Sequence, residues 1–157
     1  MSTLDVAGRR FSLSRAVAAD LPELVALLAD DVLGRERETT ASEPYRRAFA
    51  RIDADEDQLL LAVRDEHARL VATMQLMLLT SLSRAGATRL QIEAVRVAAS
   101  VRGAGLGSAL FVWAHDWGRD RGATLAQLTT DSSRAQAQRF YERLGYRASH
   151  VGFKLLL

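Results

Sequence analysis

The chain has 157 residues, of which 21 are Lys or Arg, 19 are Asp or Glu, and none is Cys. The lack of Cys excludes a disulfide framework, a thiolate zinc site, an iron–sulfur cluster and a cysteine nucleophile. Its length and its 48% hydrophobic content fit one domain over residues 1–157. The isoelectric point near 9.5 does not indicate a strongly basic protein, because the net charge is only +2 and few groups titrate just above neutrality. We therefore expect no nucleic-acid partner.

Charge is divided unevenly along the chain. Residues 1–88 carry 11 Arg and 14 acidic residues, a net charge of −3, whereas residues 89–157 carry nine Arg, one Lys and five acidic residues, a net charge of +5. The negative half suits a cationic partner and the positive half suits a polyanionic one. The alternative is a chance distribution of charges over a solvated surface. The N-terminus lacks the apolar core of a signal peptide, and residues 70–82 are too short to span a bilayer. We therefore expect a cytoplasmic protein with no membrane partner.

The first half of the chain is predicted to contain two helices and three strands. Asp20 is the expected N-cap of the first helix, which carries a leucine stripe and ends at Gly34. The segment 65–68 is the expected turn of a β-hairpin. In chain order, the predicted strand, helix, helix and two hairpin strands cover residues 11–17, 20–34, 43–52, 58–64 and 70–79.

The second half is predicted to continue as strand, loop, helix, strand, helix and strand. These elements cover residues 89–97, 103–107, 106–119, 124–130, 137–144 and 148–156. Alternation within the strand 89–97 places Gln91, Glu93, Val95 and Val97 on one face, and Leu90, Ile92, Ala94 and Arg96 on the other. Helices interspersed among strands indicate a mixed α/β fold.

A glycine-rich segment, residues 102–108, follows a predicted strand and begins a helix. Its sequence is Arg-Gly-Ala-Gly-Leu-Gly-Ser. Glycines let a backbone approach a ligand closely, and a helix N-terminus favours an anion. Arg102 adds a permanent charge suited to a phosphate. A tight turn without a ligand is the alternative. A dinucleotide fingerprint does not fit, because Ser108 stands where its third glycine would be.

The motif Arg102-x-x-Gly105-x-Gly107, after a strand ending Val95-Arg96-Val97, resembles the acetyl-CoA motif of the GCN5-related N-acetyltransferase (GNAT) family. Residues 139–146, Arg-Phe-Tyr-Glu-Arg-Leu-Gly-Tyr, resemble that family's penultimate helix and the turn after it. Within the family, residues 137–154 are similar to aminoalkylphosphonate N-acetyltransferases. The resemblance implies a mixed, splayed β-sheet flanked by helices. It also implies direct transfer of the acetyl group of acetyl-CoA to a primary amine of a small molecule.

The resemblance further implies where acetyl-CoA binds. Its pyrophosphate would lie on the amides of the glycine-rich segment, and its pantetheine arm would pair with the backbone of the preceding strand. Many family members have Asn where this chain has Arg134, which we expect to contact either CoA or an anionic group of the acceptor. The candidate CoA-binding residues are Val95, Arg96, Val97, Arg102, Gly103, Ala104, Gly105, Leu106, Gly107, Ser108 and Arg134.

Two residues are candidates for proton transfer. Tyr141 stands at the family position of the acid that protonates the departing thiolate, and a phenol is protonated at neutral pH. Packing within the apolar stripe of its helix is the alternative. Glu93 is the candidate base, because it is the only acidic residue between Glu66 and Asp116 and lies in an apolar strand, where acids are rare. An ion pair with an Arg is the alternative.

Four further residues are candidates for binding the acceptor: Glu36, Glu38, Asp131 and His150. The two Glu residues fall where the family lines its acceptor pocket, and Asp131 could instead cap the next helix. The three His residues lack metal-ligand spacing, so no metal site is expected. Family members often dimerise, which makes a homodimer a further expectation. A catalytically silent acyl-CoA-binding sensor and a protein or peptide N-acetyltransferase are the competing functions.

Overall fold

The computed structural model describes residues 1–30 and 41–156 of the chain. Its centre is a six-stranded sheet with the strands in chain order, β1 to β6. Each pair of neighbouring strands from β1 to β5 is antiparallel, and β6 runs parallel to β5. The strands cover Ser2–Val6 (β1), Arg9–Arg15 (β2), Gln58–Arg64 (β3), Leu70–Thr80 (β4), Thr88–Val97 (β5) and Ala123–Leu128 (β6).

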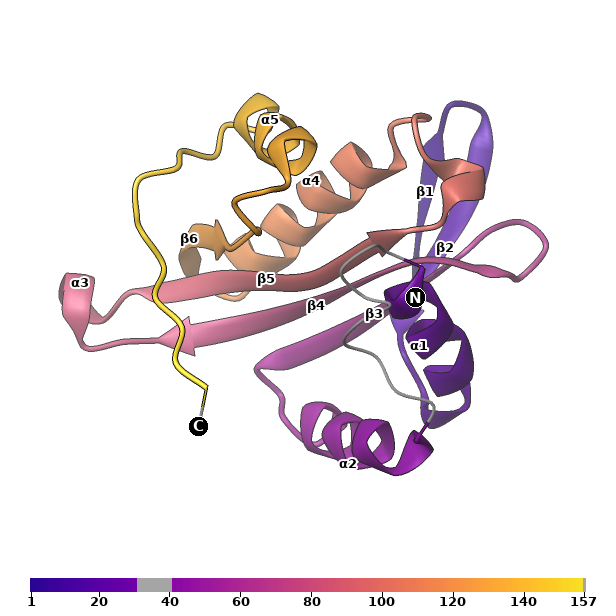
Figure 1. Cartoon of the computed structure of the whole chain (residues 1–157), viewed down its shortest axis with the longest axis horizontal. Helices are drawn as coiled ribbons and strands as arrows, with labels where there is room; N and C mark the ends of the chain where they lie inside the picture. Colours follow the sequence, from indigo (N-terminus) through magenta and orange to yellow (C-terminus); the bar gives the residue numbers. More distant parts are fainter. Residues whose placement is uncertain (31–40, 157) are drawn as a thin grey trace.

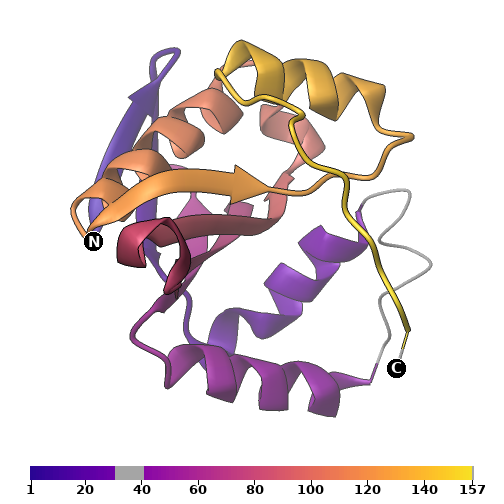
Figure 2. The ribbon, with the colours of Figure 1, turned by 90° about the vertical axis from the view of Figure 1, so that its left-hand side faces the viewer.

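Helices cover both faces of this sheet (Figures 1 and 2). The helices α1 and α2 lie on one face, and α4 and α5 lie on the other. The short helix α3 forms the connection between β4 and β5. The described helices cover Leu21–Ala29 (α1), Ser42–Asp53 (α2), Ser83–Gly86 (α3), Leu106–Arg119 (α4) and Ala135–Arg143 (α5), with 3-10 turns at Ala18–Asp20 and Ala99–Val101.

The sheet separates two cores because alternate side chains of a strand point to opposite faces. On β3, Leu61 and Val63 belong to the main core, which α4 covers with Leu110 and Phe111. Ala62, between them in sequence, belongs to a smaller core beneath α1 and α2. The mixed α/β fold with a sheet flanked by helices is therefore confirmed. None of the described helices has the length and apolarity needed to cross a membrane.

The structure departs from the sequence predictions at both ends of the chain. A first strand, β1, was not expected; it pairs with β2 through a turn in which Ala7 and Gly8 both have positive φ, as a tight hairpin turn requires. At the other end, the predicted strand over residues 148–156 is wrong, because no described strand pairs with it. Without such pairing the segment has no ladder of backbone hydrogen bonds to hold it as a strand.

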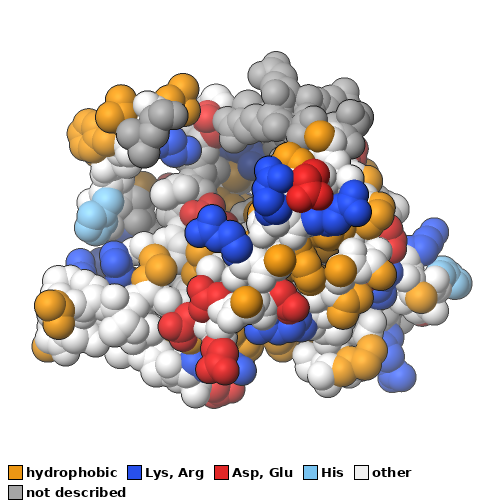
Figure 3. Space-filling model, turned by 90° about the horizontal axis from the view of Figure 1, so that it is seen from below, with side chains coloured by type: hydrophobic (Ala, Val, Ile, Leu, Met, Phe, Trp, Pro, Cys, Tyr) orange, Lys and Arg blue, Asp and Glu red, His pale blue; other side chains and the backbone are white. Residues whose placement is uncertain are grey.

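This C-terminal segment, residues 147–156, runs from α5 to the side of the molecule on which α2 lies (Figures 1 and 2). Apolar side chains are concentrated at its end, as the upper left of Figure 3 shows. Those of Val151, Phe153, Leu155 and Leu156 are 82–97% exposed. The segment is thus apolar without contributing to either core.

The first helix also differs in detail from its prediction. Asp20 precedes α1, but its carboxylate does not cap that helix. It accepts hydrogen bonds from the backbone N–H of Val17, at 2.9 Å, and from the guanidinium of Arg64, at 2.6 Å. The buried carboxylate therefore joins the start of α1 to β3. The predicted helix end at Gly34 lies outside the described residues.

Candidate active site

A cleft opens where β5 and β6 separate. The two strands pair in parallel from Thr88 with Ala123 to Ile92 with Leu128, and β5 continues to Val97 without this neighbour. The cleft has a volume of about 650 Å³ and lies between the end of β5 and the start of α5. Its lining residues are Val95, Arg96, Val97, Arg102, Ser133, Arg134, Ala135, Gln136, Ala137, Phe140 and Tyr141.

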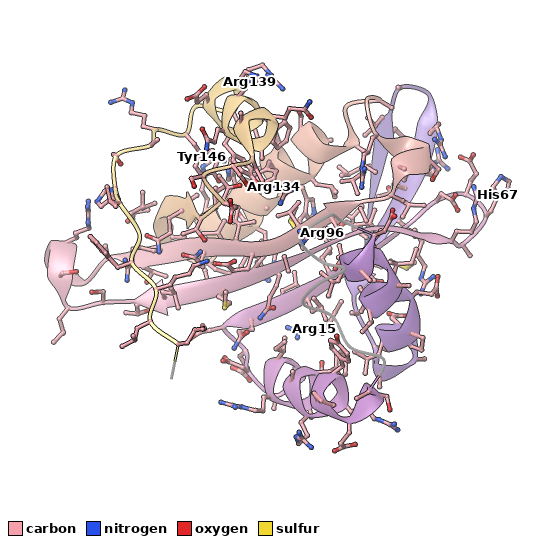
Figure 4. All side chains as sticks on the ribbon, in the orientation of Figure 1. Arg15, His67, Arg96, Arg134, Arg139 and Tyr146 are labelled. Atoms are coloured by element: carbon pink, nitrogen blue, oxygen red, sulfur yellow. The ribbon has the colours of Figure 1, made fainter. Side chains whose placement is uncertain are left out.

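The cleft brings together residues that are far apart in sequence. Arg96 lies on β5, Arg102 on the loop before α4, and Arg134 just before α5. Figure 4 shows Arg96 and Arg134 on the two sides of the gap between β5 and α5, whereas Arg139 points away from it. Three permanently charged guanidinium groups around one cleft favour an anionic ligand.

β5 contains a bulge at Ala94, whose φ is +51°. Glu93 lies opposite Gln75 of β4, and Arg96 lies opposite Thr73. β5 therefore has one residue more than β4 between these two pairs. Residues directly opposite one another on antiparallel strands share a face of the sheet. The extra residue consequently puts Glu93 and Arg96 on the same face.

The bulge corrects the alternation predicted for residues 89–97. Strict alternation placed Val95 and Val97 on the face of Glu93, and Arg96 on the opposite face. In the structure, Val95 and Val97 pack against the main core, and Val97 pairs with the core residue Ala72. The prediction fails because one inserted residue reverses the facing of every side chain after it.

The glycine-rich segment forms the N-terminus of α4 beside the cleft. Gly105 is the N-cap residue, with a φ of +87° that disfavours any residue with a Cβ. Gly107 faces the ring of Phe140, which lines the cleft, and a Cβ there would lie 3.5 Å from that ring, an ordinary van der Waals contact. Leu106 points its side chain into the main core. The predicted turn and helix start are therefore present at residues 102–108.

Two arginines bond to the backbone of the bulged strand. Arg96 donates to the carbonyl of Val95 at 2.9 Å, and Arg102 donates to the carbonyl of Val97 at 2.7 Å. These carbonyls belong to the segment predicted to pair with a pantetheine arm. Each carbonyl oxygen has a second lone pair, so a further donor can still bind there.

Glu93 is the end of a chain of side-chain hydrogen bonds that crosses from β6 to β5. Arg89 donates to Gln127 at 3.4 Å, Gln127 donates to Gln91 at 2.6 Å, and Gln91 donates to Glu93 at 2.6 Å. Every bond points its donor toward the carboxylate. We call Arg89, Gln127 and Gln91 the amide relay. Gln91 and Gln127 were not predicted as site residues, although Gln91 was predicted to share a face of its strand with Glu93.

Tyr141 lies between the cleft and an aromatic cluster formed by Phe111, Phe140 and Tyr146. Burial raises the pKa of Tyr141, the nearby guanidiniums of Arg134 and Arg96 oppose this shift, and the charge of Glu93 adds to it. The net result is an upward shift, so the hydroxyl remains a proton donor at neutral pH.

Tyr146, a member of this cluster, was not predicted as a site residue. The hydroxyl of Tyr146 lies 2.7 Å from Nε2 of His115 on α4. Burial raises the pKa of Tyr146 and lowers the pKa of His115, so both groups stay neutral at pH 7. The pair connects α4 to the turn after α5. No sequence motif marks it, because His115 and Tyr146 are 31 residues apart.

The remaining candidate residues do not line the cleft. Asp131 bonds to the backbone N–H and hydroxyl of Ser133, at 3.0 and 2.6 Å, and so organises the turn before α5. His150 lies on the exposed C-terminal segment and bonds to Ser149. Glu36 and Glu38 lie outside the described residues. Within residues 1–30 and 41–156, no three His, Asp or Glu side chains form a group able to hold a metal ion.

The chain resembles several known proteins. Over 63 residues it is 41% identical to the aminoalkylphosphonate N-acetyltransferase of Salmonella typhimurium, a stretch that spans 40% of this chain and 41% of that relative. A crystal structure named as a transcriptional regulator from Bacillus halodurans C-125 is 39% identical, with a TM-score of 0.88 over 94% of this chain and 99% of the other. An acetyltransferase from Trypanosoma brucei is 26% identical, with a TM-score of 0.77 over 94% and 99%.

The family model described as the acetyltransferase (GNAT) family matches residues 22–146, which include α1, the bulged strand, the glycine-rich segment and α5. The match therefore contains every element that lines the cleft. GNAT enzymes are N-acetyltransferases that use acyl-CoA, and the chain belongs to this family.

Proposed function

We propose that this enzyme transfers the acetyl group of acetyl-CoA to a primary amine of a small molecule. The observation that carries the proposal is the cleft at the separation of β5 and β6. It combines three guanidinium groups with a half-buried, protonated Tyr141, and Glu93 lies close enough to influence the pKa of that tyrosine. The first feature suits a polyanionic CoA, and the others suit proton transfer during acyl transfer.

Arg102, Arg134 and Arg96 are the proposed partners of the CoA phosphates, together with the backbone amides of residues 102–108. Each guanidinium offers several donors in a fixed geometry, and each phosphate offers several acceptors. This assigns Arg134, which stands where many relatives have Asn, to CoA rather than to the acceptor. Val95 and Val97 supply the edge of β5 along which the pantetheine arm would extend.

Glu93 and Tyr141 have complementary roles in the proposed mechanism. Acetyl-CoA supplies the thioester whose carbonyl carbon the neutral amine attacks. Glu93 accepts the proton that the amine loses, through a water molecule, while the carbon–nitrogen bond forms. Tyr141 donates its proton to the sulfur as the carbon–sulfur bond breaks, and the products are an amide and free CoA. The lack of Cys fits direct attack, because a thiol acyl-enzyme cannot form.

The acceptor candidates Glu36, Glu38, Asp131 and His150 stay proposals. The related Salmonella protein is named for aminoalkylphosphonates, which are small amines, and this supports a small acceptor for this chain. The related Bacillus protein is named as a transcriptional regulator, which supports a second candidate function. In that case the chain would bind acyl-CoA as a sensor, without turnover.

Thiol release from acetyl-CoA distinguishes these functions. The assay can use a thiol-reactive dye in continuous mode, because the enzyme contains no Cys of its own. We expect turnover with at least one small amine, and a Tyr141→Phe enzyme that loses kcat while its Kd for CoA changes less than twofold. Tyr146→Phe is the matched control, since its hydroxyl bonds to His115. Tight CoA binding without turnover of amines or peptides would support the sensor, and unchanged kcat in Tyr141→Phe would exclude its role as acid.

We also propose that two copies of the chain associate through the C-terminal segment. Four exposed apolar side chains near its end need a partner, and β6 forms an edge of the described sheet with Leu125 38% exposed. The test mixes a Leu125→Cys protein with a Phe153→Cys protein under oxidising conditions. A mixed disulfide dimer supports the proposal. A monomer in light scattering, with no such dimer, excludes it.

A further inference from the structure

We propose that a second pocket, on the α1 and α2 face of the sheet, binds a compact apolar substituent of the acceptor. The preferred acceptor is then a primary amine whose nitrogen carries an uncharged alkyl or aryl group of about benzene size. This inference rests on the proposed function, since it names the substrate class for the same reaction. It depends on three observations, namely the composition of the pocket, its position and its volume.

The pocket has an apolar lining. Its residues are Leu21, Leu24, Val25, Leu28, Tyr45, Ala48, Phe49, Ile52, Leu60, Thr73, Gln75 and Ala94. None of these residues carries a charge. The hydroxyl of Thr73 donates to the carbonyl of Leu61 at 2.7 Å, and the amide of Gln75 donates to Gln58 at 2.8 Å. These polar groups are already bonded within the protein, so a ligand meets mainly carbon atoms.

Consecutive residues at the bulge in β5 line the pocket and the cleft. Ala94 lines the pocket, and the next residue, Val95, lines the cleft. Consecutive Cα atoms are about 3.8 Å apart. The pocket also contains Gln75, which lies directly opposite the proposed base Glu93. An amine nitrogen held beside Glu93 would therefore need only a short linker to place its substituent among these apolar side chains.

The volume of the pocket limits the substituent. The pocket measures about 180 Å³ and is partly open. An apolar cavity of about 150 Å³ is large enough to bind benzene in a protein interior. A benzyl group or a branched alkyl group of similar size therefore fits. Among the described residues that line the pocket, none could pair with the charge of a phosphonate or of a second ammonium group, so burial of such a group there is unfavourable. An amine with an anionic group would have to direct that group elsewhere.

A series of n-alkylamines tests this preference. The series runs from ethylamine to hexylamine, and its members have nearly the same basicity. Benzylamine and aminoethylphosphonate are measured for comparison. Each methylene buried in the pocket is expected to raise kcat/KM about fourfold until the pocket is full. The KM for acetyl-CoA should stay constant along the series. Turnover of these amines without an increase along the series, or with aminoethylphosphonate preferred over benzylamine, would overturn the inference and leave the proposed function intact.

Two alanines of α2 provide a variant and its control. Ala48 lines the pocket and Ala50 does not, and both residues are exposed. A larger side chain at an exposed position usually changes stability little. We expect Ala48→Phe to fill the pocket, so that its loss in kcat/KM for benzylamine exceeds its loss for ethylamine at least tenfold. Ala50→Phe should change both values less than twofold. Equal effects of the two substitutions on benzylamine would refute binding in this pocket.

A binding measurement separates this inference from the proposed function. Saturation-transfer NMR with benzylamine and enzyme, without acetyl-CoA, reports occupancy of the pocket and requires no chemistry. Binding to the unsubstituted enzyme and to Ala50→Phe, with loss in Ala48→Phe, supports the pocket even if no acetyl transfer occurs. Equal binding by all three proteins rejects the pocket whatever the enzyme's activity.

Discussion

Removal of the amide relay at Gln91 is expected to lower catalysis without preventing CoA binding. Gln91 is buried, and its amide donates to Glu93 at 2.6 Å while its carbonyl accepts from Gln127 at 2.6 Å. In Gln91→Leu, the carboxylate of Glu93 loses the donor that fixes its position. The relay holds the proposed base in place and does not itself contact the reacting atoms.

The expected loss follows from the strength of this one bond. A hydrogen bond to a charged group contributes about 1.5–3 kcal/mol, which corresponds to a fall in kcat/KM of about 10- to 150-fold if the whole contribution is lost. Gln127→Leu removes the bond between neutral groups to Gln91, worth about 0.5–1.5 kcal/mol, and the 3.4 Å bond from Arg89, which does not touch Glu93. It should cost about two- to tenfold. The order of the two effects follows from the positions of the two side chains along the relay.

A double-mutant cycle with Glu93→Gln provides the decisive assay. The rate of thiol release gives kcat and the KM of acetyl-CoA, while chemical denaturation monitors folding. If Gln91 acts through Glu93, then Gln91→Leu should lose most of its effect in the Glu93→Gln background, with a further change below twofold. The KM for acetyl-CoA should not move. Equal effects of Gln91→Leu in both backgrounds would refute the reasoning and assign Gln91 a structural role only.

Three further predictions concern charge. Arg102→Ala should raise the KM for acetyl-CoA about 10- to 100-fold in steady-state kinetics with little change in kcat, unlike Arg121→Ala. Asp65→Asn should lower the free energy of unfolding in urea by about 2–3 kcal/mol, because this buried carboxylate accepts bonds from the turn between β3 and β4. Burial lowers the pKa of His115, so the unfolded chain binds a proton more readily than the folded chain, and stability falls as pH drops below about 6.5. On acidification, the melting temperature of His115→Gln should therefore fall less than that of the unsubstituted protein. The melting temperature of His67→Gln should fall as much as that of the unsubstituted protein.

Much of the fold could be predicted from the sequence because its signals are local. The glycine-rich segment and the stripe that includes Tyr141 are each continuous in sequence, and the structure places Arg102 of the first and Tyr141 of the second at the cleft. β1 was missed because its burial is only partial and its sequence is short and polar. The C-terminal segment was predicted as a strand from the same local pattern. A strand also needs a neighbour, and apolar alternation alone does not supply one.

The amide relay and the apolar pocket depend on pairing between strands, and neither could be predicted from local patterns. Gln127 reaches Gln91 only because β6 aligns these two residues in parallel register. The bulge at Ala94 has a similar effect on the site, since one inserted residue lets Glu93 and Arg96 share a face while Val95 and Val97 face the core. Deleting Ala94 should therefore do more than shorten β5. It would restore regular pairing, in which Glu93 stays opposite Gln75 and Arg96 stays opposite Thr73, and it would remove a residue that lines the pocket. The increase in kcat/KM along the alkylamine series should therefore weaken, while the KM for acetyl-CoA should change little.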